Sequence, residues 1–411
     1  MTATDKAKQG TTALVLMVAL AVFIHALDRG NFATAAPLIK DQLALTNTQI
    51  GLLISAFFWT YVPGHILAGG LIERIGAART LTLALTTWSL ATLLTGLAGG
   101  FGALLALRLL LGLGESAGFP ATSKLLATAL PPARLGAANG LVGAGLMLGN
   151  GAGVLLGGLL VAALGWQALF LVFGALSLLW LVPWLTMTRA GEQRLTLPPS
   201  AHPAPSYARI LKRRETWGAL LGMFCGNYPY FIVLSWLPLY LVKQQGFSLQ
   251  AMAWLGGAIY LAGALINLIG GPYVDRLIAR GADPAAVRKA VVVASSLVGT
   301  VCMVACALGN SQVAVAGLAG YALAIGLGPI GSFTAGQTLA GPAAAGKWMA
   351  LQNGTGGLAG VVGPLVTGML IDATGNYRMA FLFSAAVALI GAMMWGVVIR
   401  RIEPIDWEQA D

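Results

Sequence analysis

Residues 108–121 read RLLLGLGESAGFPA, an apolar stretch with a cation at its first position and an acid in its middle. Arg108 and Glu115 are seven residues apart, close to two turns of an α-helix, so both side chains lie on one face, about 10 Å apart along the axis. A charge at the centre of a membrane helix costs about 2.5–3.5 kcal/mol on the insertion scale. The stretch therefore predicts a membrane-spanning helix whose two charges have partners or a function.

The composition around this stretch is that of a membrane protein. Of 411 residues, 57% are hydrophobic and 9% are charged, and the mean hydropathy is +0.80. A soluble domain carries about 25% charged residues, so this chain cannot cover itself with a polar surface. The net charge of +10 could suit a nucleic acid, but the basic residues lie in short segments between apolar runs. That pattern predicts orientation in a lipid bilayer and no nucleic-acid partner.

Twelve apolar stretches are long enough to cross a bilayer as helices, which takes about 20 residues. They are 12–39, 50–72, 80–98, 102–126, 136–163, 167–188, 217–242, 250–274, 287–309, 312–340, 347–371 and 378–399. The first continues past Asp28, which favours a retained helix over a cleaved signal peptide. Alternate assignment of the loops puts most of the 24 lysines and arginines on the side of the two termini. The positive-inside rule then predicts cytoplasmic termini.

The chain also divides into two similar halves. The proline-rich, basic segment 189–216 is typical of a cytoplasmic linker, and it separates a six-helix half at 1–188 from a second at 217–411. A Gly-x3-acid-Arg motif follows the second span and recurs after the eighth. We therefore predict an all-α membrane protein with twelve transmembrane helices in two six-helix pseudo-repeats, with a binding site near the midplane between the halves.

The repeated motif resembles the cytoplasmic signature of the major facilitator superfamily, with Glu in place of the usual Asp. The resemblance implies a cytoplasmic gate motif at Gly69, Glu73, Arg74, Gly76 and Arg79, and in the second half at Asp275 and Arg276. The segments LDRGNFATAAPLI, FFWTYVPGHILAGGLIERIG, RLLLGLGESAGFPA and SWLPLYL resemble one branch of that family, the anion:cation symporters. This second resemblance covers nearly the whole chain.

The resemblance implies a function and a location. We expect proton-coupled uptake of a small organic anion, a sugar acid or another monocarboxylate, by alternating access in the bacterial inner membrane. An organic-anion exchanger, a drug-type proton antiporter and a non-transporting nutrient sensor on the same fold are the alternatives. An enzyme is not expected, because the chain has no H-E-x-x-H, G-x-S-x-G or Cys/His metal motif. We expect a monomer without cofactor or metal.

Four charges lie inside the predicted spans, all in the first half: Asp28, Arg29, Arg108 and Glu115. A buried carboxylate beside a guanidinium stays ionised, and it can exchange a proton when the guanidinium moves away. Arginine keeps its charge and binds a carboxylate through two parallel hydrogen bonds. We therefore predict that the two acids carry protons and that the two arginines bind the anion. The alternative is a structural ion-pair network that joins spans one and four.

Uncharged and titratable neighbours supply the remaining candidates. His25 shares a helix face with Asp28 and Arg29 and titrates near neutral pH, so it is either a relay member or a hydrogen-bonded lining residue. Tyr61 in span two resembles a substrate contact of the family. The spans of the second half contain only neutral polar groups, and the substrate-binding candidates among them are Asn227, Tyr228, Gln337, Gln352 and Asn353. Each could instead bond a neighbouring helix.

Overall fold

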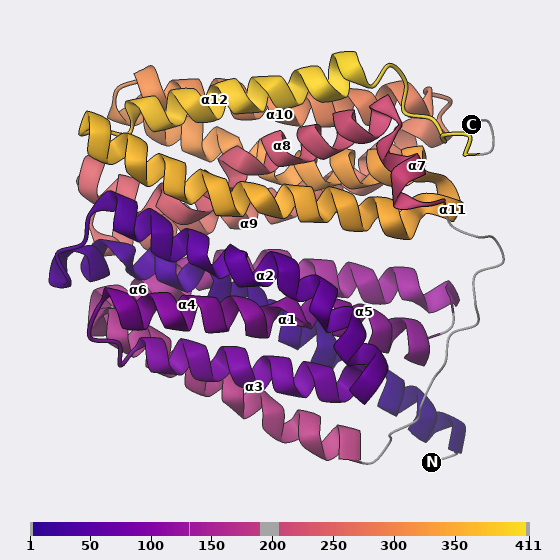
Figure 1. The fold of residues 1–411 in the computed structure, drawn as a ribbon, viewed down its shortest axis with the longest axis horizontal. Coiled ribbons are helices and arrows are strands. Elements are labelled where there is room, and N and C mark those ends of the chain that lie inside the picture. The colour runs from indigo at the N-terminus through magenta and orange to yellow at the C-terminus, as the bar shows by residue number, and fades with distance from the viewer. Residues whose placement is uncertain (1–2, 131, 190–204, 408–411) are drawn as a thin grey trace. The chain divides into compact units, whose positions relative to one another are not determined.

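The computed structural model describes residues 3–130, 132–189 and 205–407, and within these ranges all regular structure is helical (Figure 1). By length and composition, nine helical stretches of the described chain can cross a membrane. The chain divides into two compact units. Unit 1 comprises Met1–Pro198 with Pro238–Ala258, and unit 2 comprises Pro199–Leu237 with Ile259–Asp411.

The helices of unit 1 are long and separated by short turns. They are α1 (Ala3–Gln42), α2 (Asn47–Ile75), α3 (Ala77–Thr95), α4 (Phe101–Ser116), α5 (Gly118–Ala129) and α6 (Pro132–Arg189). Helix α6 holds two spans, because Gly165 adopts a φ of 85° and reverses the chain without a loop. Only glycine reaches that region without a steric penalty.

Helix α1 packs against the first half of α6 through backbone contact. Gly145, Gly149 and Gly153 are spaced four residues apart, so they lie along one face of α6. A Cβ atom added to any of them would lie within 2.8 Å of a carbonyl oxygen of α1. Small residues at this spacing let two membrane helices approach closely. The contact fixes α1, which carries three of the predicted site residues.

The fourth span is broken in the middle. The sequence predicts one helix over 102–126, whereas the structure has α4 ending at Ser116 and α5 beginning at Gly118. Pro120 explains the break, because it lacks the N–H that would bond the carbonyl of Ser116 and its ring clashes with that carbonyl. The break, at Ala117, lies two residues after Glu115.

The helices of unit 2 follow the same pattern. They are α7 (Tyr207–Leu211), α8 (Arg214–Leu239), α9 (Leu249–Ala279), α10 (Pro284–Leu308), α11 (Ser311–Thr374) and α12 (Arg378–Met393), with a π-helical turn at Met394–Val398. The end of α8, the π-helical turn Tyr240–Gln244 and the first residues of α9 fall in Pro238–Ala258, which belongs to unit 1. Gly341, with a φ of 61°, divides α11 into two spans. If α4 and α5 form one span and α6 and α11 two each, the described chain has the twelve predicted spans. Helix α7 and the first residues of α8 fall within the predicted linker 189–216.

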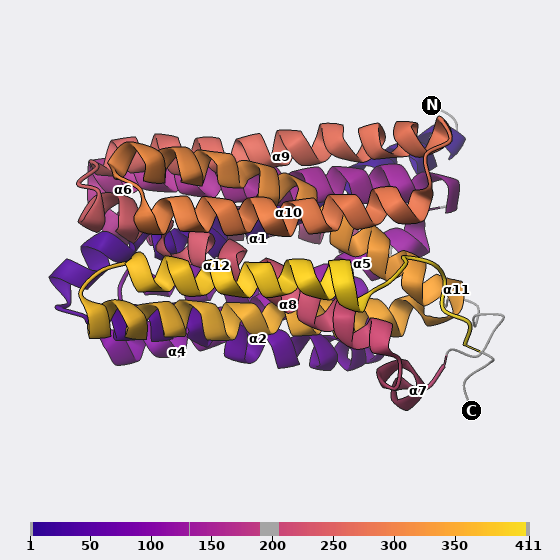
Figure 2. The ribbon, with the colours of Figure 1, turned by 90° about the horizontal axis from the view of Figure 1, so that it is seen from above.

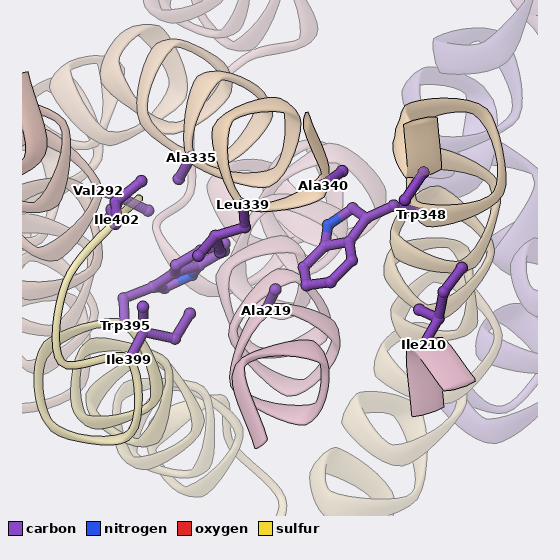
Figure 3. Close-up of a cluster of buried hydrophobic side chains, with 11 residues drawn as sticks. Ile210, Ala219, Val292, Ala335, Leu339, Ala340, Trp348, Trp395, Ile399 and Ile402 are labelled. Atoms are coloured by element: carbon purple, nitrogen blue, oxygen red, sulfur yellow. The ribbon is translucent and has the colours of Figure 1, made fainter. Parts of the chain in front are cut away.

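A buried hydrophobic cluster joins the ends of several helices of unit 2 (Figure 3). Its largest members include Trp348 of α11 and Trp395, which follows α12. The segment after α12 closes over it: the backbone N–H of Ile405 donates to the carbonyl of Leu339 at 2.9 Å, and Trp407 Nε1 donates to that of Ala340 at 2.8 Å. These bonds satisfy carbonyls that a helix end otherwise leaves without a donor.

Candidate functional site

Glu115 lies in the last turn of α4 with a fully buried carboxylate. Its Oε2 is 3.2 Å from Nδ1 of His25 and 3.9 Å from Nη2 of Arg29, both on α1. Neither carboxylate oxygen accepts a well-aligned hydrogen bond from the described residues. The acid is therefore held by charge and proximity, an arrangement that a small movement of α1 or α4 can change.

His25 lies between the arginine and the acid. Arg29 Nη2 is 2.8 Å from Nε2 of His25, four residues earlier on the helix. A guanidinium can only donate, so Nε2 accepts and the ring proton of a neutral imidazole is on Nδ1, which faces Glu115. The three side chains thus form a row, Arg29–His25–Glu115, through which a proton on Nδ1 can reach the carboxylate.

Aromatic rings enclose this row. The His25 ring lies 5.4 Å from Phe119, 5.8 Å from Trp88 and 6.2 Å from Tyr61, measured between ring centroids. The Arg29 guanidinium lies over the Tyr61 ring at 4.9 Å, a cation–π contact. These walls exclude water from the acid, which strengthens every electrostatic interaction inside the cluster.

Asp28 occupies a separate, neutral environment although it is adjacent to Arg29 in the chain. Its carboxylate accepts hydrogen bonds from Asn31 Nδ2 at 3.0 Å and from Ser177 Oγ of α6 at 3.2 Å. The side chain is 2% exposed. The two predicted proton carriers therefore differ: Glu115 faces a cation and Asp28 faces two neutral donors. The sequence gives no signal for Ser177, a single serine in an apolar run.

Arg108 contacts α2 instead of a carboxylate. Its Nε donates to the carbonyl of Leu53 at 3.1 Å and its Nη2 to that of Ile54 at 3.4 Å, and the guanidinium lies 5.1 Å from the rings of Phe32 and Phe57. Among the described residues Arg108 forms no ion pair with a carboxylate, and Arg29 is the arginine nearest Glu115. Two turns of helix hold Arg108 too far from Glu115 for contact.

Two candidates of unit 2 are buried in helix packing. Gln352 is 0% exposed; its Oε1 accepts from Trp348 Nε1 at 2.9 Å, and its Nε2 donates to the carbonyl of Ser332 at 2.9 Å. It therefore joins the two spans of α11.

Tyr228 of α8 is 1% exposed, and its hydroxyl has no hydrogen-bond partner among the described residues. The remaining candidates are more accessible: Asn227 is half-buried, and Gln337 and Asn353 are exposed.

The gate motif lies at the junction of α2 and α3. Gly76 adopts a φ of 87° there, ending one helix and beginning the next, which explains the need for glycine. Arg74 and Arg79 are exposed, and Arg79 lines a cavity of about 570 Å³ together with residues of α2, α3 and α6. The side chain of Glu73 lies outside the described residues. Gly69 has open space around it, and Asp275 and Arg276 are exposed on α9.

Comparison with known proteins relates this sequence to a family of membrane transporters. A family model described as Major Facilitator Superfamily matches residues 18–353. A probable sulfoacetate transporter of Cupriavidus necator is 30% identical, with 92% of this chain and 91% of that protein covered. A hexuronate transporter of Bacillus subtilis is 29% identical, with 95% and 94% covered.

Solved structures agree on the fold. A bacterial homologue of the human lysosomal transporter Spinster, in an inward-facing and unoccupied conformation, superposes with a TM-score of 0.78 at 18% identity, covering 95% of this chain and 97% of that one. The family match and the two transporter relatives identify the chain as a multi-pass membrane transporter and not an enzyme. The chain belongs to the Major Facilitator Superfamily.

Proposed function

We propose that the protein is a proton-coupled symporter that takes up a small organic anion by alternating access. The observation that carries the proposal is the buried row Arg29–His25–Glu115, which combines a permanent cation, a neutral imidazole and an acid in contact. The names of two relatives refer to sulfoacetate and hexuronate, both organic anions, and this supports the substrate class.

The row couples the anion to the proton by competition for Arg29. Arg29 is 15% exposed and the more accessible of the two arginines. Its planar fork can bind an incoming carboxylate through two parallel hydrogen bonds. When the guanidinium turns to the substrate, Glu115 loses its cation in an apolar enclosure, where an unpaired charge is costly. The acid then takes up a proton through His25, and the site carries substrate and proton together.

The other charges have supporting roles in this scheme. Asp28 is the second proton carrier, and the protonation of its carboxylate would change the hydrogen bonds that join α1 to Ser177 on α6. Arg108 is a second anion-binding group that in this conformation holds the backbone of α2. The break between α4 and α5 gives the fourth span a point of bending beside Glu115. We place the protein in the bacterial inner membrane as a monomer with cytoplasmic termini.

The test is gradient-driven uptake by proteoliposomes, with labelled sulfoacetate and glucuronate as probes. With one proton per substrate, a gradient of one pH unit supports about tenfold accumulation, because one unit corresponds to about 1.4 kcal/mol. We expect Glu115→Gln to abolish accumulation but to preserve counterflow of labelled against unlabelled substrate. Glu403→Gln, the same change at a side chain that is 55% exposed, should accumulate substrate like the wild type.

Two results would contradict the proposal. Normal accumulation by Glu115→Gln would remove the acid from coupling. Accumulation by the wild-type protein only when a second anion is loaded inside the vesicles, whatever the pH gradient, would identify an exchanger.

A further inference from the structure

Three basic side chains of unit 2 meet at the segment that follows α12. Arg214, the first residue of α8, donates from Nη2 to the carbonyl of Val398 at 2.7 Å. Lys289 of α10 donates from Nζ to the carbonyl of Arg400 at 2.9 Å. Arg400 itself is exposed on the same segment. Three cations, from α8, α10 and the chain after α12, therefore lie at the backbone of residues 398–400.

Buried neighbours hold this segment in place. Ile399 is 0% exposed and Ile402 is 1% exposed, and both belong to the hydrophobic cluster in Figure 3. The two residues between them, Arg400 and Arg401, are exposed. Anchoring on both sides directs the arginine side chains away from the core. The position of the basic group is thus built into the packing of unit 2.

Nearby acids neutralise only part of this charge. Arg401 pairs with Asp283 at 3.6 Å and with Glu403 at 3.1 Å. Glu215 adjoins Arg214 in the chain. Lys289 and Arg400 have no carboxylate within ion-pair distance among the described residues. An ammonium has three donors and a guanidinium five, so both retain hydrogen-bonding capacity for a further anion.

Exposed apolar side chains continue from the basic group along the same helices. Trp217, one turn after Arg214 on α8, is 51% exposed, and its Nε1 donates to the carbonyl of Leu211 at 2.9 Å. Val397, three residues before Arg400, is 72% exposed. Figure 2 shows α10 and α12 side by side, in agreement with their contacts. Tryptophan with one polar end is typical of the boundary between lipid tails and headgroups.

We propose that Arg214, Lys289 and Arg400 bind the headgroup phosphate of an anionic phospholipid, whose acyl chains lie along Trp217 and Val397. Basic pockets between membrane helices bind such headgroups. The apolar continuation favours a lipid over a soluble phosphate, because only a lipid would cover it. This inference concerns unit 2 alone and goes beyond the transport activity proposed above, so either proposal can fail without the other.

The experiment is native mass spectrometry of the full chain in detergent, titrated with phosphatidylglycerol or phosphatidylcholine. We expect preferential retention of phosphatidylglycerol by the wild-type protein. The double variant Lys289→Gln/Arg400→Gln removes two cations and should bind phosphatidylglycerol about thirtyfold more weakly. Arg400→Lys keeps the charge and should retain most of the binding. The matched control Arg280→Gln/Arg378→Gln removes two exposed cations elsewhere and should bind like the wild type.

Each contrary outcome overturns the proposal. Equal retention of the two lipids by the wild type, or undiminished phosphatidylglycerol binding by the double variant, would show that these cations serve orientation only. Displacement of the lipid by millimolar glycerol phosphate would assign the site to a soluble phosphate. Equal loss in the control variant would show a response to net charge. Thermal unfolding of each variant without added lipid reports whether it is folded.

Discussion

Replacement of Gly149 by alanine tests the backbone contact that positions the charged row. Gly149 lies on α6 opposite α1, and a Cβ atom there would lie 2.3 Å from the carbonyl oxygen of Phe23 and 2.8 Å from Cβ of Ala26. Real Cβ atoms do not approach a backbone oxygen this closely, and the obstacle is backbone, which cannot rotate away. Helix α1 must therefore shift outward, and with it His25 and Arg29.

The expected magnitude follows from two opposing effects. Overpacking a close contact costs about 1–3 kcal/mol, whereas alanine in place of a helical glycine gains about 0.5–1 kcal/mol. Gly143 on the same helix has no atom within 4 Å of an added Cβ, so Gly143→Ala should show only the gain. The two variants should thus differ by about 1–3 kcal/mol. For a unit of this size, that is about 2–12 °C in unfolding temperature.

The assay is thermal unfolding of the purified protein in detergent, together with uptake by proteoliposomes. We expect Gly149→Ala to unfold at a lower temperature than the wild type and to lose uptake, because the 3.2 Å contact between His25 and Glu115 depends on the position of α1. Gly143→Ala should unfold at or above the wild-type temperature with normal uptake. If both variants unfold alike, the reasoning from α1–α6 contact is refuted.

Two further substitutions test the arginine and gate predictions. Arg108→Lys keeps the positive charge but loses the guanidinium fork, which donates to two carbonyls of α2 and which we predict binds the anion. Substrate affinity, measured by ligand-induced thermal shift, should fall at least about tenfold, or ~1.4 kcal/mol. Unchanged affinity would exclude Arg108 from the anion site. Glu73→Ala should alter transport rate more than substrate affinity, by a coupling of about 1–3 kcal/mol, and should make a cysteine on α5 more reactive to a water-soluble thiol reagent. If Glu73→Ala has the wild-type transport rate and the cysteine the wild-type thiol reactivity, the gate motif only sets the orientation of the chain in the membrane.

The fold could be predicted from the sequence because hydropathy and length determine where a chain can cross a bilayer. The reversals at Gly165 and Gly341 fall in the gaps 164–166 and 341–346 that the predicted spans leave, so hydropathy placed both of them. One feature of the fourth span escaped that logic. The break at Ala117 did have a signal in Pro120, but proline also occurs inside membrane helices that continue, as Pro63 does in α2.

For the candidate site, the sequence predicts contacts between residues of one helix but not contacts between helices. The i, i+4 spacing of His25 and Arg29 implies their shared face, and the structure shows their contact. The contact of both residues with Glu115 depends on how α1 packs against α4 and α5, which spacing within one helix cannot reveal. Ser177 illustrates the limit, since its hydrogen bond to Asp28 joins residues 149 positions apart.

The break in the fourth span has a consequence for how two helices are linked. Pro120 leaves the carbonyl of Ser116 without its helical donor, one residue from the buried acid. Lipid cannot supply a donor, and the His65 side chain of α2 hydrogen-bonds this carbonyl instead. A bond that a regular helix would keep within itself thus ties α4 to α2, so a displacement of the chain at Glu115 is transmitted to the neighbouring helix.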